Sequence, residues 1–227
     1  MNPTGYREYR TPGLACSWTA ALPPGAEPYV QRVLPDGCVD VIWAGGGIVV
    51  AGPDTGPMPA VMRPGEEIAA VRFAPGAAPP VLGVPADALR DGRVPLRELW
   101  GGEADRLAEA VAAADDRRAA LVAALRARMG PADPLVAAMA GGLAEGSVRD
   151  VADALGMGER QLRRRSVAAF GYGPKTLQRV LRFQRALGLA RAGGPLAEVA
   201  YAAGYADQAH FAHEVRALAG EPVRNLL

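Results

Sequence analysis

The stretch Val148-Arg-Asp-Val-Ala-Asp-Ala-Leu-Gly-Met157 returns near the C-terminus in a diverged form, Leu196-Ala-Glu-Val-Ala-Tyr-Ala-Ala-Gly-Tyr205. In each copy apolar residues recur at helical spacing and a glycine follows, which predicts a short amphipathic helix ended by a left-handed turn. A second helical pattern comes after each glycine, so each copy has the form of a helix-turn-helix. Two such units in one short segment indicate DNA binding.

The helix predicted after the first copy, over residues 159–170, is unusually basic. Apart from a few apolar residues, it displays four arginines within six positions. Arginine forks can bind guanine edges in the major groove, and their charge attracts phosphates. This favours a helix that reads DNA, although a solvated basic face would explain the same residues taken alone. The displayed side chains are Arg160, Gln161, Arg163, Arg164 and Arg165.

The second copy continues into Asp207-Gln-Ala-His-Phe-Ala-His213, which opens with an aspartate suited to cap a helix. Gln208 lies at the helix entrance, where it can bond an adenine edge, and His213 lies about a turn and a half later. Phe211 is expected in the core. We expect no metal at His210 and His213, because one flanking carboxylate and no nearby cysteine make a poor ligand set.

Residues 174–190, between the two copies, read as one linker helix that starts with a proline. At 1.5 Å per residue it is roughly 25 Å long, which suits two reading helices placed near the ~34 Å repeat of the major groove. Lys175, the only lysine in the chain, lies on this helix with Arg179 and Arg182. These three side chains are candidates for phosphate contacts, and a plain solvated helix face is the alternative.

Residues 131–227 resemble the DNA-binding domain of AraC-type transcriptional regulators. The resemblance rests on Gly171-Tyr-Gly-Pro-Lys175, on Arg179-Val-Leu-Arg-Phe-Gln-Arg185 and on Gly204-Tyr-Ala-Asp-Gln-Ala-His-Phe211. It implies an all-α domain with two helix-turn-helix units whose recognition helices enter adjacent major grooves. The groove-facing positions implied by the resemblance are Arg160, Arg163, Arg164, Gln208 and His213.

Three positions depart from that family pattern. Gly158 stands where a serine commonly caps the first recognition helix, and His213 stands where arginine is common. Ser166 stands where a core phenylalanine is expected. We expect this serine to leave a void in the small core, filled in part by Phe170, so that Ser166→Phe would stabilise the domain.

Length and charge indicate two domains. Proline and glycine cluster near residues 130–134, which predicts a boundary between residues 1–130 and residues 131–227. The second part holds 12 basic and 9 acidic residues, net +3, and the remaining 13 basic and 15 acidic residues give the first part net −2. The polarity has the sign expected for DNA binding. The composition suggests a bacterial protein, and without a secretory or long apolar segment we expect it in the cytoplasm with no membrane partner.

The first 100 residues predict short strands bounded by Gly, Pro or Asp, at residues 6–10, 14–21, 28–34, 38–44, 47–51 and 67–73. Residues 87–99 are predicted to be partly helical, and residues 103–129 to form two helices. The expected fold is therefore α+β, with a small antiparallel β barrel or sandwich and its helices ahead of the all-α domain. In AraC-type proteins such a domain is usually a cupin-like sensor. Two motifs, Leu34-Pro-Asp-Gly-Cys-Val-Asp-Val-Ile-Trp43 and Ala70-Val-Arg-Phe-Ala-Pro-Gly76, resemble those of a short class of sensor domain.

Nothing in the sequence indicates catalysis. Residues 1–209 contain no histidine, the chain has two cysteines, and neither a phosphate-binding glycine loop nor a nucleophile elbow occurs. We therefore predict no enzyme, no catalytic residues, no metal and no cofactor. Cys16 and Cys38 are expected to be reduced thiols, with redox sensing by the pair as a minor alternative.

Two charges fall within apolar strands. Alternation places Asp40 on one face with Cys38 and Ile42, and Arg72 interrupts another apolar strand. A charge that faces inward needs a partner, so we expect an Asp40–Arg72 pair. One interpretation is a buried pair that fixes the β domain. The other is a small polar ligand bound by Asp40 and Arg72, with Trp43 or Trp18 as a stacking wall.

These patterns together predict a DNA-binding transcription regulator whose N-terminal domain senses a ligand, dimerises, or does both. The expected partners are double-stranded DNA, a small-molecule effector, a second copy of the chain, and RNA polymerase if the protein is an activator. The alternative is a small-molecule-binding or catalytic β domain with a vestigial helix-turn-helix. A continuous positive face would favour the first, and interruption by Asp150, Glu159 or Glu214 would favour the second.

Overall fold

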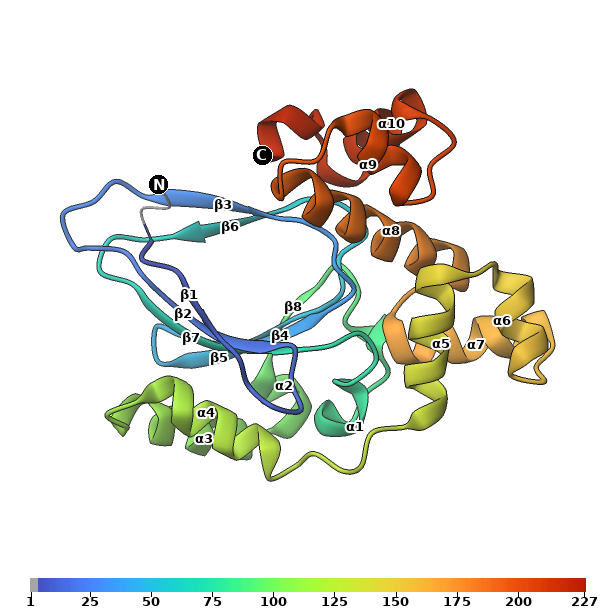
Figure 1. Cartoon of the computed structure of the whole chain (residues 1–227). Coiled ribbons are helices and arrows are strands. Elements are labelled where there is room, and N and C mark those ends of the chain that lie inside the picture. Colours follow the sequence, from blue (N-terminus) through green and yellow to red (C-terminus); the bar gives the residue numbers. More distant parts are fainter. Residues whose placement is uncertain (1–3) are drawn as a thin grey trace.

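The computed structural model describes residues 4–227 and contains two antiparallel sheets and two groups of helices (Figure 1). Six strands form one sheet in the order β1-β2-β7-β4-β5-β8, and β3 and β6 form a separate sheet. The two sheets do not close into a barrel, so of the two predicted forms the open arrangement of facing sheets is the one observed. The strands are β1 Arg7–Tyr9, β2 Cys16–Ala21, β3 Tyr29–Val33, β4 Val39–Ala44, β5 Gly47–Ala51, β6 Met58–Met62, β7 Glu67–Phe73 and β8 Arg93–Pro95.

The six predicted strands are all present, each within two residues of its predicted ends. Two further strands were not predicted. β6 contains Pro59, which cannot donate to a ladder and lowers the strand signal, and it is tolerated because β6 pairs on one side only, with β3. β8 has three residues, too few for alternation to be visible.

Helices cover one face of the six-stranded sheet (Figure 1). Inward side chains of the central strands, such as Val41, Val71 and Phe73, are fully buried against them. The segment predicted to be partly helical, residues 87–99, is so: it holds the end of a 3₁₀ turn and most of a short helix, with the unpredicted strand β8 between them. The elements on this face are α1 Pro79–Leu82, η1 Ala86–Ala88, α2 Leu96–Trp100, α3 Gly102–Ala113 and α4 Arg117–Arg126.

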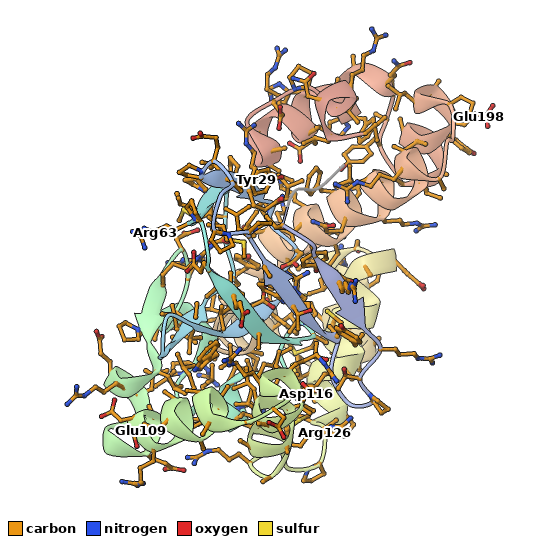
Figure 2. All side chains as sticks on the ribbon, turned by 90° about the vertical axis from the view of Figure 1, so that its left-hand side faces the viewer. Tyr29, Arg63, Glu109, Asp116, Arg126 and Glu198 are labelled. Carbon is orange, nitrogen blue, oxygen red and sulfur yellow. The ribbon has the colours of Figure 1, made fainter. Side chains whose placement is uncertain are left out.

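The C-terminal part is helical throughout and contains both predicted helix-turn-helix units, α6–α7 and α9–α10, joined by the long helix α8 (Figure 1). Glu198 on α9 projects from the end of the molecule farthest from Glu109 on α3 (Figure 2). The elements are α5 Pro134–Glu145, α6 Val148–Ala154, α7 Glu159–Phe170, α8 Pro174–Arg191, α9 Leu196–Ala202, α10 Gln208–Ala219 and the 3₁₀ turn η2 Val223–Leu226.

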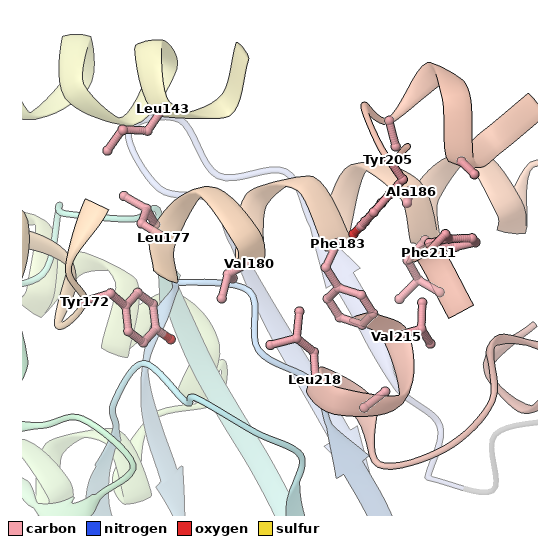
Figure 3. Packing of buried hydrophobic residues seen from close by; sticks show 14 of the residues in the cluster. Leu143, Tyr172, Leu177, Val180, Phe183, Ala186, Tyr205, Phe211, Val215 and Leu218 are labelled. Carbon is pink, nitrogen blue, oxygen red and sulfur yellow. The ribbon is translucent and has the colours of Figure 1, made fainter. Parts of the chain in front are cut away.

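Helix α8 is the centre of this core (Figure 3). Leu177, Val180 and Phe183 lie on its buried stripe and are fully enclosed. Phe211, predicted as a core residue of the second unit, is buried, and so is Leu162 in the first unit. Both helix-turn-helix units, α6–α7 and α9–α10, therefore pack against α8 in one shared core.

Ser166, where we expected a void, is held by a hydrogen bond. Ser166 is fully buried, and its hydroxyl donates to the carbonyl oxygen of Tyr172 at 2.8 Å. Phe170 lies one turn later and is also buried. The serine therefore hydrogen-bonds the turn that leads into α8, and a phenylalanine here would remove that hydrogen bond, which the sequence did not indicate. Gly158 does leave α7 without a side-chain cap, as predicted.

Within residues 4–227, no helix combines the length and the apolar character that a membrane span needs.

Candidate functional site

Helix α7 presents its arginines to solvent. It begins directly after the turn at Gly156, and its apolar side chains, Leu162 and Phe170, face the core. The opposite face is exposed and, within the described residues, none of its arginines has an ion pair or a hydrogen bond with another side chain. Unpaired guanidinium groups on an exposed helix are free to bind an external anion or base edge. This face carries Arg160, Gln161, Arg163, Arg164 and Arg165.

Helix α10 is the counterpart of α7 in the second unit. The carboxylate of Asp207 accepts a hydrogen bond from the backbone N–H of His210 at 2.7 Å and so caps the helix, as predicted. Gln208 is therefore the first helical residue, and both Gln208 and His213 are exposed. His210 turns back, since its Nδ1 accepts from the N–H of Ala206 at 3.3 Å. The exposed part of α10 thus includes Gln208 and His213, and also Arg216, which was not predicted.

Arg179 does not have the predicted place on an open helix face. Its Nε and Nη2 donate to the two carboxylate oxygens of Glu214 at 2.8 and 3.1 Å, joining α8 to α10. The hydrogen bonds from Arg179 lower the pKa of Glu214. Arg182 is also engaged, since its guanidinium lies 5.2 Å from the ring centroid of Tyr205. Of the predicted phosphate contacts, only Lys175, in the first turn of α8, is exposed.

Two of the three acidic residues that could interrupt a positive face have local partners. Glu214 is paired as described, and Asp150 completes a capping box with Ser147 at the start of α6. Hydrogen bonds from Ser147 lower the pKa of Asp150. Glu159 is the exposed exception, at the start of α7, where the helix dipole favours an acid.

A cavity of about 400 Å³ lies between the six-stranded sheet, the β3–β6 sheet and α8. The N-terminal strands supply most of its wall. Helix α8 supplies Gln184, Leu187 and Arg191, so the cavity is formed by both parts of the chain. Its volume lies within the usual range for small-molecule sites.

The predicted Asp40–Arg72 pair is confirmed, and it lines this cavity. Arg72 Nε and Nη2 donate to the two oxygens of Asp40 at 2.9 and 2.8 Å. A second carboxylate, Asp36, lies 3.7 Å from Nη1 of the same guanidinium. Burial raises the pKa of Asp36, and the charge of Arg72 opposes that effect. Burial disfavours the charge of Arg72 too, but the two carboxylates raise its pKa overall.

Trp43 does not line the cavity, so its predicted role as a wall for a ligand at Asp40 is wrong. It alternates with Asp40 on β4 and faces the helices, where its Nε1 donates to the carbonyl oxygen of Ala108 at 3.2 Å. Trp18, the other tryptophan considered, lies on the cavity face of β2.

A second ion pair in the wall of the cavity, Asp54–Arg93, was not predicted from the sequence. Arg93 donates to both carboxylate oxygens of Asp54 at 2.9 and 2.8 Å. Asp54 lies outside any strand and Arg93 begins a three-residue strand, so neither position carries a periodic signal. The backbone carbonyl of Asp54 also accepts a hydrogen bond from the Tyr172 hydroxyl, between α7 and α8.

Cys16 and Cys38 are free thiols, in agreement with the prediction, and both line or adjoin the cavity face. Burial raises the pKa of each thiol, and for Cys38 the charge of Asp36 adds to the effect. Thiols held protonated in this way are poor nucleophiles, which does not favour redox sensing.

Comparison with known proteins adds two matches to families. Residues 151–227 match a family described as a helix-turn-helix domain, and residues 11–95 match one described as a domain of unknown function (DUF6597). No curated protein sequence matches the chain.

Three solved structures illustrate the similar folds. ToxT from Vibrio cholerae O395 is 8% identical with a TM-score of 0.46, over 97% of this chain and 96% of that chain. ToxT from Vibrio cholerae strain SCE256 with a bound unsaturated fatty acid is 9% identical with a TM-score of 0.44, over 100% and 97%. ToxT from Vibrio cholerae O395 bound to (E)-4-(8-methylnaphthalen-1-yl)but-3-enoic acid is 8% identical with a TM-score of 0.45, over 100% and 95%.

Proposed function

The C-terminal domain of this chain belongs to the AraC-type helix-turn-helix family, and from this premise we propose that the protein is a sequence-specific DNA-binding transcription regulator. One observation carries the proposal: the exposed face of α7 holds four arginines that have no partner among the described residues. A protein gains nothing in stability from clustering like charges on one face. A polyanion with base edges in a groove is the ligand that such a face fits.

Both helix-turn-helix units are proposed to bind, in adjacent major grooves. Helix α8 has 18 residues, hence a length of about 27 Å, and it separates α7 from α10 (Figure 1). The Arg179–Glu214 ion pair joins α10 to α8. Lys175 and Gln161 are proposed as flanking contacts. The groove-facing side chains would be Arg160, Arg163, Arg164, Gln208 and His213.

The N-terminal part is proposed to regulate this binding through an effector in the cavity, with a domain boundary at residues 130 and 131. It touches both helix-turn-helix units. Arg90 donates to the carbonyl oxygen of Gly171 at the end of α7, at 3.0 Å. Arg32 on β3 pairs with Glu221, just after α10, at 2.7 Å. A ligand between these two contacts could change how the two recognition helices lie relative to one another. Dimerisation and contact with RNA polymerase stay predictions.

Selection of duplexes from a randomised DNA pool by the full chain tests the proposed function. We expect enrichment of a bipartite sequence whose two halves lie about one helical turn apart. A variant with Arg160, Arg163 and Arg164 changed to alanine should lose enrichment of one half. Arg106→Ala, an exposed arginine on α3, is the matched control and should select the same sequence as the parent chain. Failure of the parent chain to enrich any sequence would support the alternative of a ligand-binding β domain with a vestigial helix-turn-helix.

A further inference from the structure

We propose that the cavity binds a small aromatic amine, with its ammonium group against Asp36 and Asp40 and its ring between the two sheets. The inference rests on the proposed function only in calling this ligand an effector. Binding itself can be measured without DNA.

The register of the sheet gives the cavity a polar end and an apolar end. Asp40, Arg72 and Cys16 are cross-strand partners and form one rung on the cavity face. Ile42, Ala70 and Trp18 form the next rung on that face, two residues along each strand. Ala44, Ile68 and Ala20 form the third rung. A ligand that fills the cavity must therefore be charged or polar at one end and apolar at the other.

The polar end carries one more negative charge than positive charge. A single guanidinium, that of Arg72, serves both Asp40 and Asp36. Asp36 is the weaker partner at 3.7 Å, and its other oxygen accepts from the N–H of Cys38 at 2.8 Å. Its Oδ2 thus has no hydrogen-bond partner among the described residues, in an environment where an unpaired charge is unfavourable. An ammonium group supplies the missing positive charge and up to three donors.

The remaining lining charges do not offset this excess at the polar end. Arg93 is neutralised by Asp54, and Arg32 by Glu221. Arg191 is exposed on the last turn of α8, at the rim of the cavity. A carboxylate ligand at the polar rung would be repelled by Asp36 and Asp40 and would find only Nη1 of Arg72 without a hydrogen bond.

The apolar end points to an aromatic ligand that carries an acceptor. Trp18 and Tyr6 line it with their ring centroids 5.5 Å apart, and Tyr29 contributes from the facing sheet. The Nε1–H of Trp18 is buried and has no acceptor among the described residues. Buried donors of this kind are rare in native proteins, and a turn of the Trp18 ring toward a ligand oxygen would satisfy this one.

The spacing between the two ends sets the size of the ligand. Two residues along a strand separate the Asp40 rung from the Trp18 rung, which is about 7 Å. An amine joined to a phenol ring by a two-carbon chain covers this distance. Tyramine is accordingly the probe of choice, with tyrosol and hydroxyphenylacetate as its neutral and anionic counterparts.

Titration calorimetry of the full chain with these three probes tests the inference. We expect tyramine to bind at least about tenfold more tightly than tyrosol, since a charged hydrogen bond is worth that much, and hydroxyphenylacetate to bind more weakly still. Asp36→Asn should reduce tyramine affinity about tenfold and leave tyrosol affinity unchanged. Asp115→Asn, an exposed aspartate between α3 and α4, is the matched control and should change neither.

Trp18→Phe provides a second test, because it keeps a ring in the wall and removes the N–H. It should weaken the phenolic tyramine several-fold and leave phenethylamine, which has no acceptor, unaffected. Tighter binding of the acid than of the amine, or binding of none of the probes, would overturn the inference. Neither result would change the outcome expected from the DNA selection. A chain that binds tyramine but enriches no DNA would overturn the proposed function and not this inference.

Discussion

The guanidinium of Arg179 on α8 forms a two-point ion pair with the carboxylate of Glu214 on α10, at 2.8 and 3.1 Å. The carboxylate is largely enclosed, with its side chain 14% exposed. The pair fixes the second recognition helix to the central helix of the domain. Arg179, predicted as a phosphate contact, therefore also has a structural role in positioning α10.

Glu214→Gln should lower the free energy of unfolding by about 1 kcal/mol at neutral pH, because the ion pair becomes a neutral hydrogen bond. Since the folded-state pKa of Glu214 lies below its ordinary value, the stabilisation is present at neutral pH and disappears as the pH falls through that lowered pKa. Urea unfolding at a series of pH values measures both effects. The exposed Glu198→Gln on α9 serves as control, and equal pH profiles for the Glu214→Gln variant and the parent chain would contradict a role for the pair.

Ser166→Ala should destabilise the protein by about 1–3 kcal/mol, because the carbonyl of Tyr172 loses its buried donor. Ser166→Phe should cost at least as much, since the position is fully enclosed and Phe170 already fills the neighbouring space. Thermal unfolding of both variants measures this. A higher melting temperature for the phenylalanine variant would show that unfilled space exists there.

Gly171→Ala tests the contact between the two parts of the chain. Gly171 has φ +76, and a Cβ at this position would lie 2.6 Å from Cγ of Pro53. Gly156 has φ +62 with no atom within 4 Å of such a Cβ, so Gly156→Ala carries the same backbone strain without the clash. We expect about 1 kcal/mol of destabilisation for Gly156→Ala and about 1–3 kcal/mol more for Gly171→Ala. If chemical unfolding gives the two variants equal losses in the free energy of unfolding, Pro53 can move away from the added Cβ at no cost, and the contact is not a tight one.

Arg164→Ala should weaken binding to the selected DNA by about 1–3 kcal/mol and relax the preference at one base pair, because a groove-facing arginine binds guanine through two hydrogen bonds. Lys175→Ala should weaken binding to all sequences alike and reduce the salt dependence, as expected for a phosphate contact. Competition binding with single-base variants of the site distinguishes the two. An unchanged base preference for Arg164→Ala would remove this residue from the groove.

Most of the helical half of the fold could be predicted from the sequence, because apolar residues at helical spacing and a following glycine mark several of its helices; α5 Pro134–Glu145 was not predicted. α7, for example, runs from Glu159 to Phe170 in the structure as the pattern indicated. What the pattern missed was the partner of each polar residue. Arg179 and Glu214 lie 35 positions apart, and the hydroxyl of Ser166 pairs with a backbone carbonyl. Neither contact can be predicted from the spacing of apolar and polar residues.

The cavity was predictable in part. Strand alternation brought Asp40 and Arg72 together correctly, since both lie in regular strands, β4 and β7, that pair in the middle of the sheet. Asp36 and Asp54 lie in loops, where no period constrains the side chain. The contribution of α8 to the wall depends on how the two parts pack: Gln184, for example, donates to the carbonyl of Pro35 at 2.6 Å, a contact with no signal in the sequence.

Hydroxyl-radical footprinting of the full chain on its selected DNA tests the central proposal most directly, namely that one chain reads two successive major grooves. We expect two protected patches about one helical turn apart on the same face of the duplex. The Arg164→Ala variant should lose protection of one patch, and the Gln208→Ala variant should lose protection of the other. A single patch that either variant abolishes, or no protection at all, would contradict the proposal.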